Sequence, residues 1–411
     1  MPEFLELVTP DEALRILFNA ISPVINWEVV STEIALGRIT AENILSTQDL
    51  PDFRRSTVDG YAVIAKDTHG ASESLPAYLK IAGEVPMGTA PDFHLGGKVC
   101  SIIHTGGMLP EGADSVVMLE DTQILDAGEL EIYRSVAVSE NIIEIGEDVK
   151  TGDIVIPKGV SLRPAEIGGL MALGITSIKT ARKPRFAILS SGDEVVPPSQ
   201  TTKPGQVRDI NSYTLGSLIQ VLGGESVHYG IISDNRNDML TAMEKALQEC
   251  DHLIVTAGSS ASSRDLTAEI INSMGDPGVL VHGVSIKPGK PTIFGVSGDQ
   301  VMIGLPGNPV SALVIAYILV APIIEAYLGL DSEKPKPSLQ AKITVNVASQ
   351  AGREDWIPVR LIKTALDEYL AEPVFGRSNL IFILARSDGL VKIPAATTGI
   401  EAGTSVNVRL I

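Results

Sequence analysis

Between residues 184 and 328, short apolar runs alternate with amphipathic segments, and this alternation limits the fold more than any other feature of the chain. The expected strands are 186–189, 227–232, 252–256, 279–284 and 301–305. The expected helices are 212–222, 237–248, 265–274 and 309–328. Strands that alternate with helices form a mostly parallel sheet with helices on both faces, and ligands bind at the carboxyl ends of its strands. We therefore predict a central, doubly wound α/β domain over residues 181–330.

The rest of the chain is expected to form three further domains, because 411 residues exceed what one core can bury. Residues 46–145 contain short β-type runs broken by Gly and Pro, which predicts an inserted, strand-rich domain. Residues 1–45 and 146–180 flank this insertion and are expected to form one discontinuous N-terminal domain. Its helices are predicted at 9–20, capped by Thr9, and at 164–173, closed by Gly174. Residues 331–411 alternate in β fashion, which predicts a small C-terminal β-barrel.

The composition excludes several classes of partner. A formal net charge of -18 repels nucleic acid and anionic lipid, so an anionic ligand requires a local cluster of donors. Cys100 and Cys250 are far apart and lack zinc-ligand spacing, so we expect two buried free thiols. The N-terminus contains Glu3 and Glu6 and lacks the basic region that precedes the apolar stretch of a secretory signal. The apolar run 313–324 is shorter than the ~20 residues of a membrane span. We expect a cytoplasmic protein without membrane contact.

Three polar loops directly follow expected strands and should meet at one edge of the sheet. Residues 190–194 place the carboxylates of Asp193 and Glu194 at a strand end, where they could bind Mg²⁺, act as acid or base, or form only a solvated turn. Residues 256–265 combine hydroxyls with a helix N-terminus, which is typical of an anion site but also of a polar linker. Residues 304–311 form a rigid turn in which Asn308 is placed to cap the next helix and Pro309 takes its first position.

A fourth segment, Lys-Pro-Gly-Lys-Pro at 287–291, presents two ammonium groups that could meet a phosphate. Its spacing differs from a P-loop, and Pro291 stands where a P-loop needs Ser or Thr. The chain also lacks GxSxG and HExxH motifs. Ordinary ATPase, serine hydrolase and zinc protease chemistry are therefore not expected.

The inserted domain carries Asp59 before a Gly in Ser-Thr-Val-Asp-Gly-Tyr-Ala, where an acidic residue is also a common turn former. Together with the loops above, this segment resembles one family, the molybdopterin molybdenumtransferases, which include bacterial MoeA and the E domain of gephyrin. The resemblance runs through the whole chain in a fixed order. Its motifs are Ser-x-Val-Asp-Gly-Tyr-Ala from Ser56, Thr-Gly-Gly from Thr105, Pro-x-Gly-Ala-Asp-x-Val-Val from Pro110, Gly-Glu-Asp from Gly146, Ser-Gly-Asp-Glu from Ser191, Lys-Pro-Gly-Lys-Pro from Lys287 and Gly-Leu-Pro-Gly-Asn-Pro-Val-Ser from Gly304.

The resemblance implies an elongated homodimer in which the α/β domain of one subunit and the inserted domain of the other share the active site. It implies a reaction of adenylylated molybdopterin with molybdate, dependent on Mg²⁺ or another divalent cation, that yields molybdenum cofactor and AMP. By the same resemblance, Asp59, Thr105, Asp148 and Glu194 are catalytic, and Asp193 and Glu194 bind the metal. The implied substrate-binding residues are Ser191, Asp193, Gly258, Ser259, Ser260, Asp265, Lys287, Lys290, Pro306, Asn308 and Pro309.

Two places depart from the family pattern. Many relatives carry a longer Gly-Gly-Val-Ser-x-Gly loop where this chain has Gly-Ser-Ser-Ala-Ser-Ser at 258–263, and His104 precedes Thr105. One alternative is a noncatalytic, gephyrin-like scaffold or pterin carrier, but the presence of Asp59, Asp148 and Glu194 argues against it. The other is a molybdopterin adenylyltransferase, whose members would resemble only the α/β domain of this chain. The sequence does not distinguish molybdate from tungstate, or decide whether an adenylyltransferase docks here.

Overall fold

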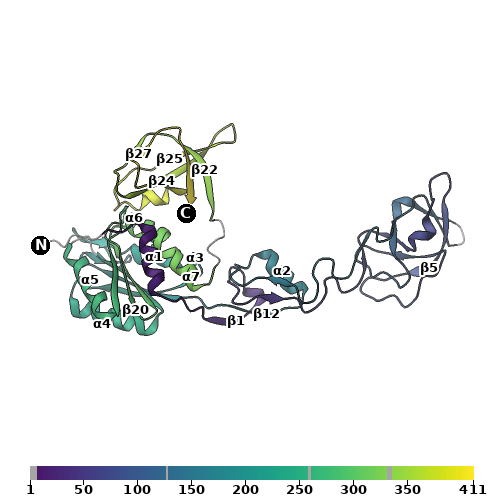
Figure 1. Ribbon diagram of the computed structural model, residues 1–411, viewed down its shortest axis with the longest axis horizontal. Coiled ribbons are helices and arrows are strands. Elements are labelled where there is room, and N and C mark those ends of the chain that lie inside the picture. Colours follow the sequence, from purple (N-terminus) through teal and green to yellow (C-terminus); the bar gives the residue numbers. More distant parts are fainter. Residues whose placement is uncertain (1–6, 126–127, 258–260, 331–335) are drawn as a thin grey trace.

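The computed structural model describes residues 7–125, 128–257, 261–330 and 336–411 (Figure 1). The molecule is elongated. The α/β domain and the C-terminal domain lie together at one end, and a narrow middle part connects them to the strand-rich domain at the other end. The multidomain α/β organisation predicted from the sequence is confirmed.

The α/β domain is built on a six-stranded sheet with the order β16-β13-β17-β21-β20-β18. Its parallel strands are β13 (Arg185–Ser191), β16 (Glu225–Ile232), β17 (His252–Ala257) and β21 (Gln300–Pro306). The antiparallel strands β20 (Ile293–Ser297) and β18 (Pro277–His282) complete one edge. The parallel strands therefore end side by side, as the alternating sequence pattern predicted.

Helices cover both faces of this sheet. On one face α4 (Arg236–Glu249) and α5 (Ala261–Met274) enclose a core that includes Met243, Ile270 and Leu253. On the other face lie α3 (Asn211–Val221), α6 (Pro309–Ile315), the π-helical turn η4 (Ala316–Val320) and α7 (Ala321–Tyr327). The prediction of a doubly wound sheet is confirmed.

The first helix differs from the expectation in where it packs. Helix α1 (Pro10–Ala20) begins at the predicted cap, where Glu12 N donates to Thr9 Oγ1 at 3.2 Å. Ala13 and Leu17 are fully buried in the core of the α/β domain, and the helix contacts β18 and β20. We expected this helix to belong with the discontinuous N-terminal domain. Its apolar stripe instead covers the antiparallel edge of the α/β sheet.

Strand β20 was not expected from the sequence, because Gly295 interrupts its short apolar run. A Cβ atom at Gly295 would overlap the side chain of Ile271 on α5. The glycine therefore allows close approach of helix and strand.

The middle part is formed by chain segments from both sides of the insertion. Strand β1 (Trp27–Ser31) pairs with β12 (Ser177–Ala181), and β2 (Ile44–Leu45) pairs with β11 (Ile154–Ile156). Helix α2 (Pro164–Ala172) ends before Gly174, whose φ is +69°, and packs near the 3-10 turn η1 (Thr32–Ile34). The domain boundaries themselves stay a prediction.

The strand-rich domain contains a six-stranded sheet with the order β7-β4-β6-β5-β9-β8. Its strands are β4 (Gly60–Val63), β5 (Ala77–Glu84), β6 (Val99–Ile103), β7 (Ser115–Met118), β8 (Thr122–Ile124) and β9 (Glu129–Ile132). The turns η2 (Ala65–Thr68) and η3 (Leu119–Asp121) interrupt it, and β3 (Arg55–Ser56) pairs with β10 (Ile142–Ile143) beside it.

The C-terminal domain is the predicted β-barrel. Strands β24 (Glu354–Lys363), β25 (Tyr369–Pro373), β22 (Ser338–Ile343), β28 (Ser405–Leu410) and β26 (Gly389–Ile393) form a closed ring, because β26 also pairs with β24. A short strand of the α/β domain, β19 (Ile286–Lys287), adds to this sheet through β24. The remaining elements are α8 (Phe382–Ala385), the pair β23 (Val347–Ala348) and β27 (Gly399–Ile400), and, in the α/β domain, the pair β14 (Val195–Val196) and β15 (Val207–Arg208).

The two cysteines and the apolar segment near residue 320 are buried, as expected from the sequence. Cys100 and Cys250 are buried and free, and burial raises the pKa of the Cys100 thiol to about 12. Within the described residues, the segment Pro309–Tyr327 is long and apolar enough to cross a membrane, but 72% of its most apolar window is buried inside the protein. This burial agrees with the expected core helix.

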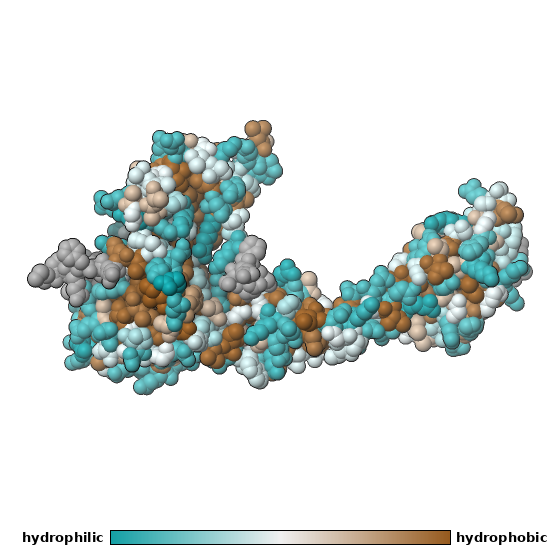
Figure 2. All heavy atoms as spheres, viewed as in Figure 1, coloured by the Kyte–Doolittle hydropathy of each residue, from teal (hydrophilic) through white to brown (hydrophobic). Residues whose placement is uncertain are grey.

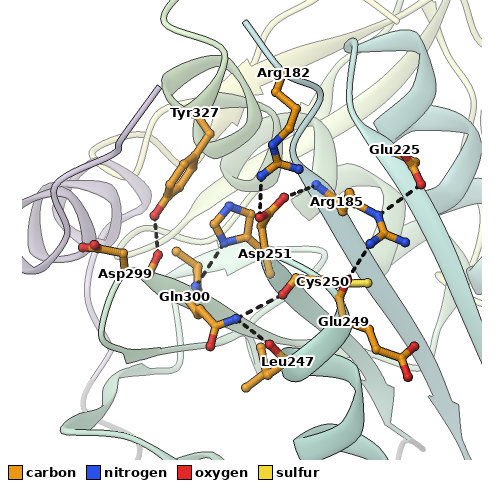
Figure 3. A network of polar contacts seen from close by, with 12 residues as sticks. Arg182, Arg185, Glu225, Leu247, Glu249, Cys250, Asp251, Asp299, Gln300 and Tyr327 are labelled. Atoms are coloured by element: carbon orange, nitrogen blue, oxygen red, sulfur yellow. Dashed lines mark hydrogen bonds and ion pairs between the residues drawn. The ribbon is translucent and has the colours of Figure 1, made fainter. Parts of the chain in front are cut away.

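A polar network lies at the amino ends of the parallel strands, opposite the expected ligand edge (Figure 3). Arg182 donates to Asp251 Oδ1 at 2.7 Å, and Tyr327 donates its hydroxyl to the backbone oxygen of Asp299 at 2.6 Å. The ring of His252 packs at a tilt between Phe186 and Tyr327, with ring centroids 4.7 and 4.1 Å away, and its Nδ1 accepts from Val301 N at 3.2 Å. Burial of its ring lowers the pKa of His252 to about 4.

This buried imidazole predicts a pH-dependent stability. Between the lowered pKa near 4 and the ordinary value near 6.5, the unfolded chain binds a proton that the folded chain does not. Stability is therefore fully present above pH 6.5 and is lost as pH falls toward 4, by about 3 kcal/mol. Urea unfolding between pH 7 and 4.5 should show a smaller loss in His252→Gln than in the wild-type protein. An equal loss in both would contradict this assignment.

Candidate functional site

The first predicted loop follows β13 at the carboxyl edge of the sheet. Ser191 is buried and its hydroxyl donates to Asp234 Oδ1, while Asp234 N donates to Asp193 Oδ1 at 3.4 Å. Asp193 and Glu194 are exposed. The structure therefore brings Ser191 and Asp193 together with Asp234, a residue that the sequence analysis missed. The sequence signal for Asp234 was its position two residues after the expected strand 227–232.

Gly192 gives this loop its shape. Its φ is +145°, and a Cβ atom there would lie 2.8 Å from Glu194 Oε2. Glu194 thus folds back over the glycine, and a larger residue at position 192 would displace its carboxylate.

The second predicted loop follows β17. Gly258, Ser259 and Ser260 lie outside the described residues, and Asp265 is exposed on α5. Beneath this edge, Ser190 Oγ lies 2.8 Å from Ser212 Oγ and 3.2 Å from Thr256 Oγ1. These buried hydroxyls fix β13, β17 and α3 relative to one another.

The third predicted loop follows β21. Pro306 ends the strand, and Pro309 takes the first position of α6 as expected. Asn308 occupies the N-cap position, but its side chain makes no capping hydrogen bond, so the expectation of a side-chain cap was wrong. Asn211 Nδ2 donates to Gly307 O at 2.9 Å and supports this turn from α3. The Asn308 side chain lines a large pocket instead.

This pocket lies between the α/β domain and the barrel and has a volume of about 950 Å³. The α/β domain contributes the segment 287–291, Asn308 and Ser311, and the barrel contributes residues near Arg353 and Arg377. The structure therefore brings Lys287, Lys290 and Asn308 together. Asp193 and Glu194 follow β13, which β17 separates from β21, and they do not line the pocket.

The pocket is locally basic in an acidic chain. Among the residues that the structure describes, its lining includes Lys287, Lys290, Arg353 and Arg377, against the single carboxylate of Asp355. The net charge of the whole chain is -18. Such a cluster attracts and neutralises anions. The sequence analysis missed both arginines because the residues after 330 were assigned only a barrel, although Arg353 and Arg377 each follow a Gly in a loop-like segment.

The backbone of the 287–291 loop is held tightly against α6. Gly289 has a φ of +116°, and a Cβ atom there would overlap the side chain of Ile315. Thr292 Oγ1 donates to Gly289 O at 2.7 Å and closes the turn.

We expect Gly289→Ala to destabilise the protein by about 2 kcal/mol, because it combines backbone strain with overlap in a packed core. Gly205→Ala is the matched control, since Gly205 also has a positive φ of +87° but no neighbour within 4 Å. Thermal unfolding measures both variants. Equal destabilisation by the two substitutions would show that contact with Ile315 is unimportant.

The predicted residues of the inserted domain, Asp59 and Thr105, lie far from this pocket within one chain. Both are exposed, as is Asp148 just beyond the inserted domain, and Thr105 N donates to Asp59 Oδ1 at 2.9 Å. His104 Nδ1 is 3.8 Å from Asp59 Oδ1, and its Nε2 lies 2.8 Å from Glu84 Oε1. Figure 1 places the domain containing β5 at the opposite end of the molecule from the α/β domain. Asp59 and Thr105 therefore form a separate polar group.

The carboxylates of Asp193 and Glu194 fit a hard divalent cation in their chemistry. Mg²⁺ prefers oxygen ligands and often uses only one or two carboxylates while it retains water. Among the residues that the structure describes, no group of three His, Cys, Asp or Glu side chains is arranged to hold a metal. The two exposed carboxylates are thus suited to a partly hydrated ion rather than to a closed metal cage.

The whole chain is similar to proteins of molybdopterin biosynthesis. Family models described as the MoeA N-terminal region (domain I and II), a probable molybdopterin binding domain and the MoeA C-terminal region (domain IV) match residues 8–174, 187–326 and 340–411. A putative molybdopterin biosynthesis protein of Methanocaldococcus jannaschii is 36% identical over 414 residues, covering 97% of each chain. The molybdopterin molybdenumtransferase of Haemophilus influenzae is 34% identical over 404 residues, covering 98% of each.

A solved structure extends the similarity to three dimensions. The crystal structure of the molybdopterin biosynthesis moeA protein from Pyrococcus horikoshii OT3 has a TM-score of 0.86 to this chain at 30% identity. It covers 99% of this chain and 100% of that one. The likeness therefore includes every domain.

Proposed function

Because this chain belongs to the MoeA family, we propose that it inserts molybdate into adenylylated molybdopterin and releases AMP, the last step of molybdenum cofactor synthesis. The observation that carries this proposal is the basic pocket of about 950 Å³ between the 287–291 loop and the barrel. Adenylylated molybdopterin and molybdate are both anions. An acidic chain binds them only where cations are concentrated.

In the proposed reaction, the phosphoanhydride bond between AMP and the pterin phosphate breaks, and one water adds across it. Molybdate loses oxygen as water when the two dithiolene sulfurs bind molybdenum. Lys287 and Lys290 would neutralise the charge that develops on the phosphate or hold the incoming oxyanion. The side chain of Asn308, which makes no capping hydrogen bond, would donate a hydrogen bond to the substrate. The loop at 258–265 would contact the pterin or its phosphate.

A divalent cation, Mg²⁺ by preference, is the proposed cofactor. Asp193 and Glu194 would hold it beside the pyrophosphate, where it would supply charge neutralisation. Glu194 depends on Gly192 for its orientation, and Asp193 accepts a hydrogen bond from the backbone of Asp234. These contacts keep both carboxylates at the strand end.

A homodimer with a shared active site is proposed because Asp59, Thr105 and Asp148 do not reach the α/β domain of their own chain. The middle part also exposes large apolar side chains, including Trp27, Val29, Ile34 and Ile154, which a second copy would cover. Figure 2 shows hydrophobic patches along this narrow part. The inserted domain of the second copy would then face the strand-end carboxylates.

Two further expectations remain proposals. A cytoplasmic location is supported by the two buried free thiols, since disulfides are rare in that compartment. A molybdopterin adenylyltransferase is the proposed docking partner, because its product would be this protein's substrate.

A comparison of two substrate mixtures distinguishes the proposed molybdate insertion from the adenylylation of molybdopterin. The purified protein is supplied either with adenylylated molybdopterin, molybdate and Mg²⁺, or with free molybdopterin, ATP and Mg²⁺. We expect AMP from the first mixture and no pyrophosphate from the second. Pyrophosphate release from ATP would assign the preceding step instead.

A further inference from the structure

Asp355 is the one acidic side chain in the pocket lining over the described ranges, and it is almost completely buried. Its side chain is 1% exposed. Its Oδ1 accepts from Arg353 Nε at 2.9 Å, and its Oδ2 lies 3.7 Å from Lys287 Nζ. Within the described residues, Oδ2 has no hydrogen-bond partner. A buried carboxylate is unfavourable unless cations compensate it, so these two cations stabilise Asp355 and are held by it.

The two cations come from different domains. Lys287 belongs to β19 of the α/β domain, and Arg353 directly precedes β24 of the barrel. Parallel pairing of these strands places Lys287 opposite Asp355, and Glu354 N donates to Ser285 O at 2.9 Å. The backbone pairing that joins the domains therefore also places the lysine beside the carboxylate.

Both cations remain accessible from the pocket. The Lys287 side chain is 58% exposed and that of Arg353 is 33% exposed. The Asp355 carboxylate thus lies inside the protein, while the Lys287 ammonium and the Arg353 guanidinium that contact it still face the pocket where an anion would bind.

We propose that Asp355 is a positioning residue, which holds Lys287 of the α/β domain and Arg353 of the barrel in the arrangement that binds the oxyanion. This inference rests on the proposed function. The inference adds Asp355 to the site. Its carboxylate repels the anion by charge, but it holds in place the two cations that bind the anion. Ordering a flexible lysine before binding lowers the entropic cost of binding.

The charge of Asp355 makes the proposal testable, because the two possible roles have opposite signs. If Asp355 acts only through its charge, Asp355→Asn makes the pocket more positive and molybdate binds more tightly. If it positions the cations, the same substitution weakens binding. Asn preserves the shape of the side chain, so the comparison isolates the carboxylate charge.

Glu354 offers a matched control on the same strand. It is also buried, at 7%, and pairs with Lys392 at 2.6 Å rather than lining the pocket. Neighbouring residues of a strand point to opposite faces. Glu354→Gln therefore removes the same charge from the same strand but leaves the two pocket cations in place.

The experiment is calorimetric titration of full-length protein with molybdate alone. We expect Asp355→Asn to weaken molybdate binding by about tenfold or more, and Glu354→Gln to leave it within about twofold. Unchanged or tighter binding by Asp355→Asn would overturn the proposal. An equal loss in both variants would also overturn it, as would no wild-type binding at millimolar molybdate.

A second pair of variants tests the proposal if Asp355→Asn does not fold. Lys287 is paired with Asp355, whereas Lys290 is an exposed lysine of the same loop without an ion pair among the described residues. Lys287→Met should weaken molybdate binding more than Lys290→Met, and equal losses would overturn the proposal. AMP release by the wild-type protein is measured separately, so failure of the proposed reaction is distinguishable from failure of this positioning role.

Discussion

Heterodimers that combine one Asp59→Asn subunit with one Glu194→Gln subunit are expected to retain about half of the wild-type activity, although each variant alone is inactive. Each substitution should reduce AMP release by about 100-fold or more, because it removes a charged group from the reacting centre. In the mixed dimer, one site combines the intact Asp59 domain of one subunit with the intact Glu194 domain of the other. The second site carries both substitutions.

The measurement uses co-expressed subunits with two different tags, so that only mixed dimers are assayed. Asp59→Asn combined with Asp148→Asn is the matched control, because both residues would enter a shared site from the same subunit, opposite the α/β domain, and neither site would be intact. The shared site is supported if the Asp59→Asn subunit recovers activity when it is paired with a Glu194→Gln subunit but not when it is paired with an Asp148→Asn subunit. Failure of both mixtures would contradict it, provided that the dimers form.

The double substitution of Lys287 and Lys290 by Ala is expected to reduce kcat/KM for adenylylated molybdopterin by about 100-fold or more. Lys287 and Lys290 are two of the four basic residues in the described part of the pocket lining. Their loss leaves the substrate anions without compensation in a chain of net charge -18. Steady-state kinetics at low and high salt measures the effect, which should shrink as salt rises.

Lys245→Ala is the control for this prediction, since Lys245 is an exposed lysine of α4 outside the pocket lining. It changes the net charge in the same direction. We expect its kcat/KM to stay within about twofold of the wild-type value. A loss similar to that of the pocket lysines would mean that overall charge, rather than the pocket, determines binding.

Local patterns predicted the α/β domain well because each element carries its own signal. The apolar run that became β17 is fully buried, and α4 shows the expected helical spacing with Met239 and Met243 inward. Parallel strands that alternate with helices leave few possible arrangements. The carboxyl edge, with Asp193 and Glu194 after β13 and Asn308 after β21, followed from that topology.

Features that depend on distant contacts were not predictable in the same way. The amphipathic pattern of α1 shows that Leu17 must be buried, but it does not say against which domain. The role of Gly295 in β20 depends on the position of Ile271. Arg353 and Lys287 both contact Asp355 only because β19 pairs with β24, and a pairing of two residues between domains has no recognisable sequence pattern.

The most direct test of the central claim is a single-turnover reaction of purified protein with adenylylated molybdopterin, molybdate and Mg²⁺, in which AMP and bound molybdenum are measured together. The proposed function predicts that both products appear at the same rate and in equal amounts, and that omission of molybdate prevents cofactor formation. Tight binding of the substrate without AMP release above background would contradict it and would identify the protein as a pterin carrier or scaffold.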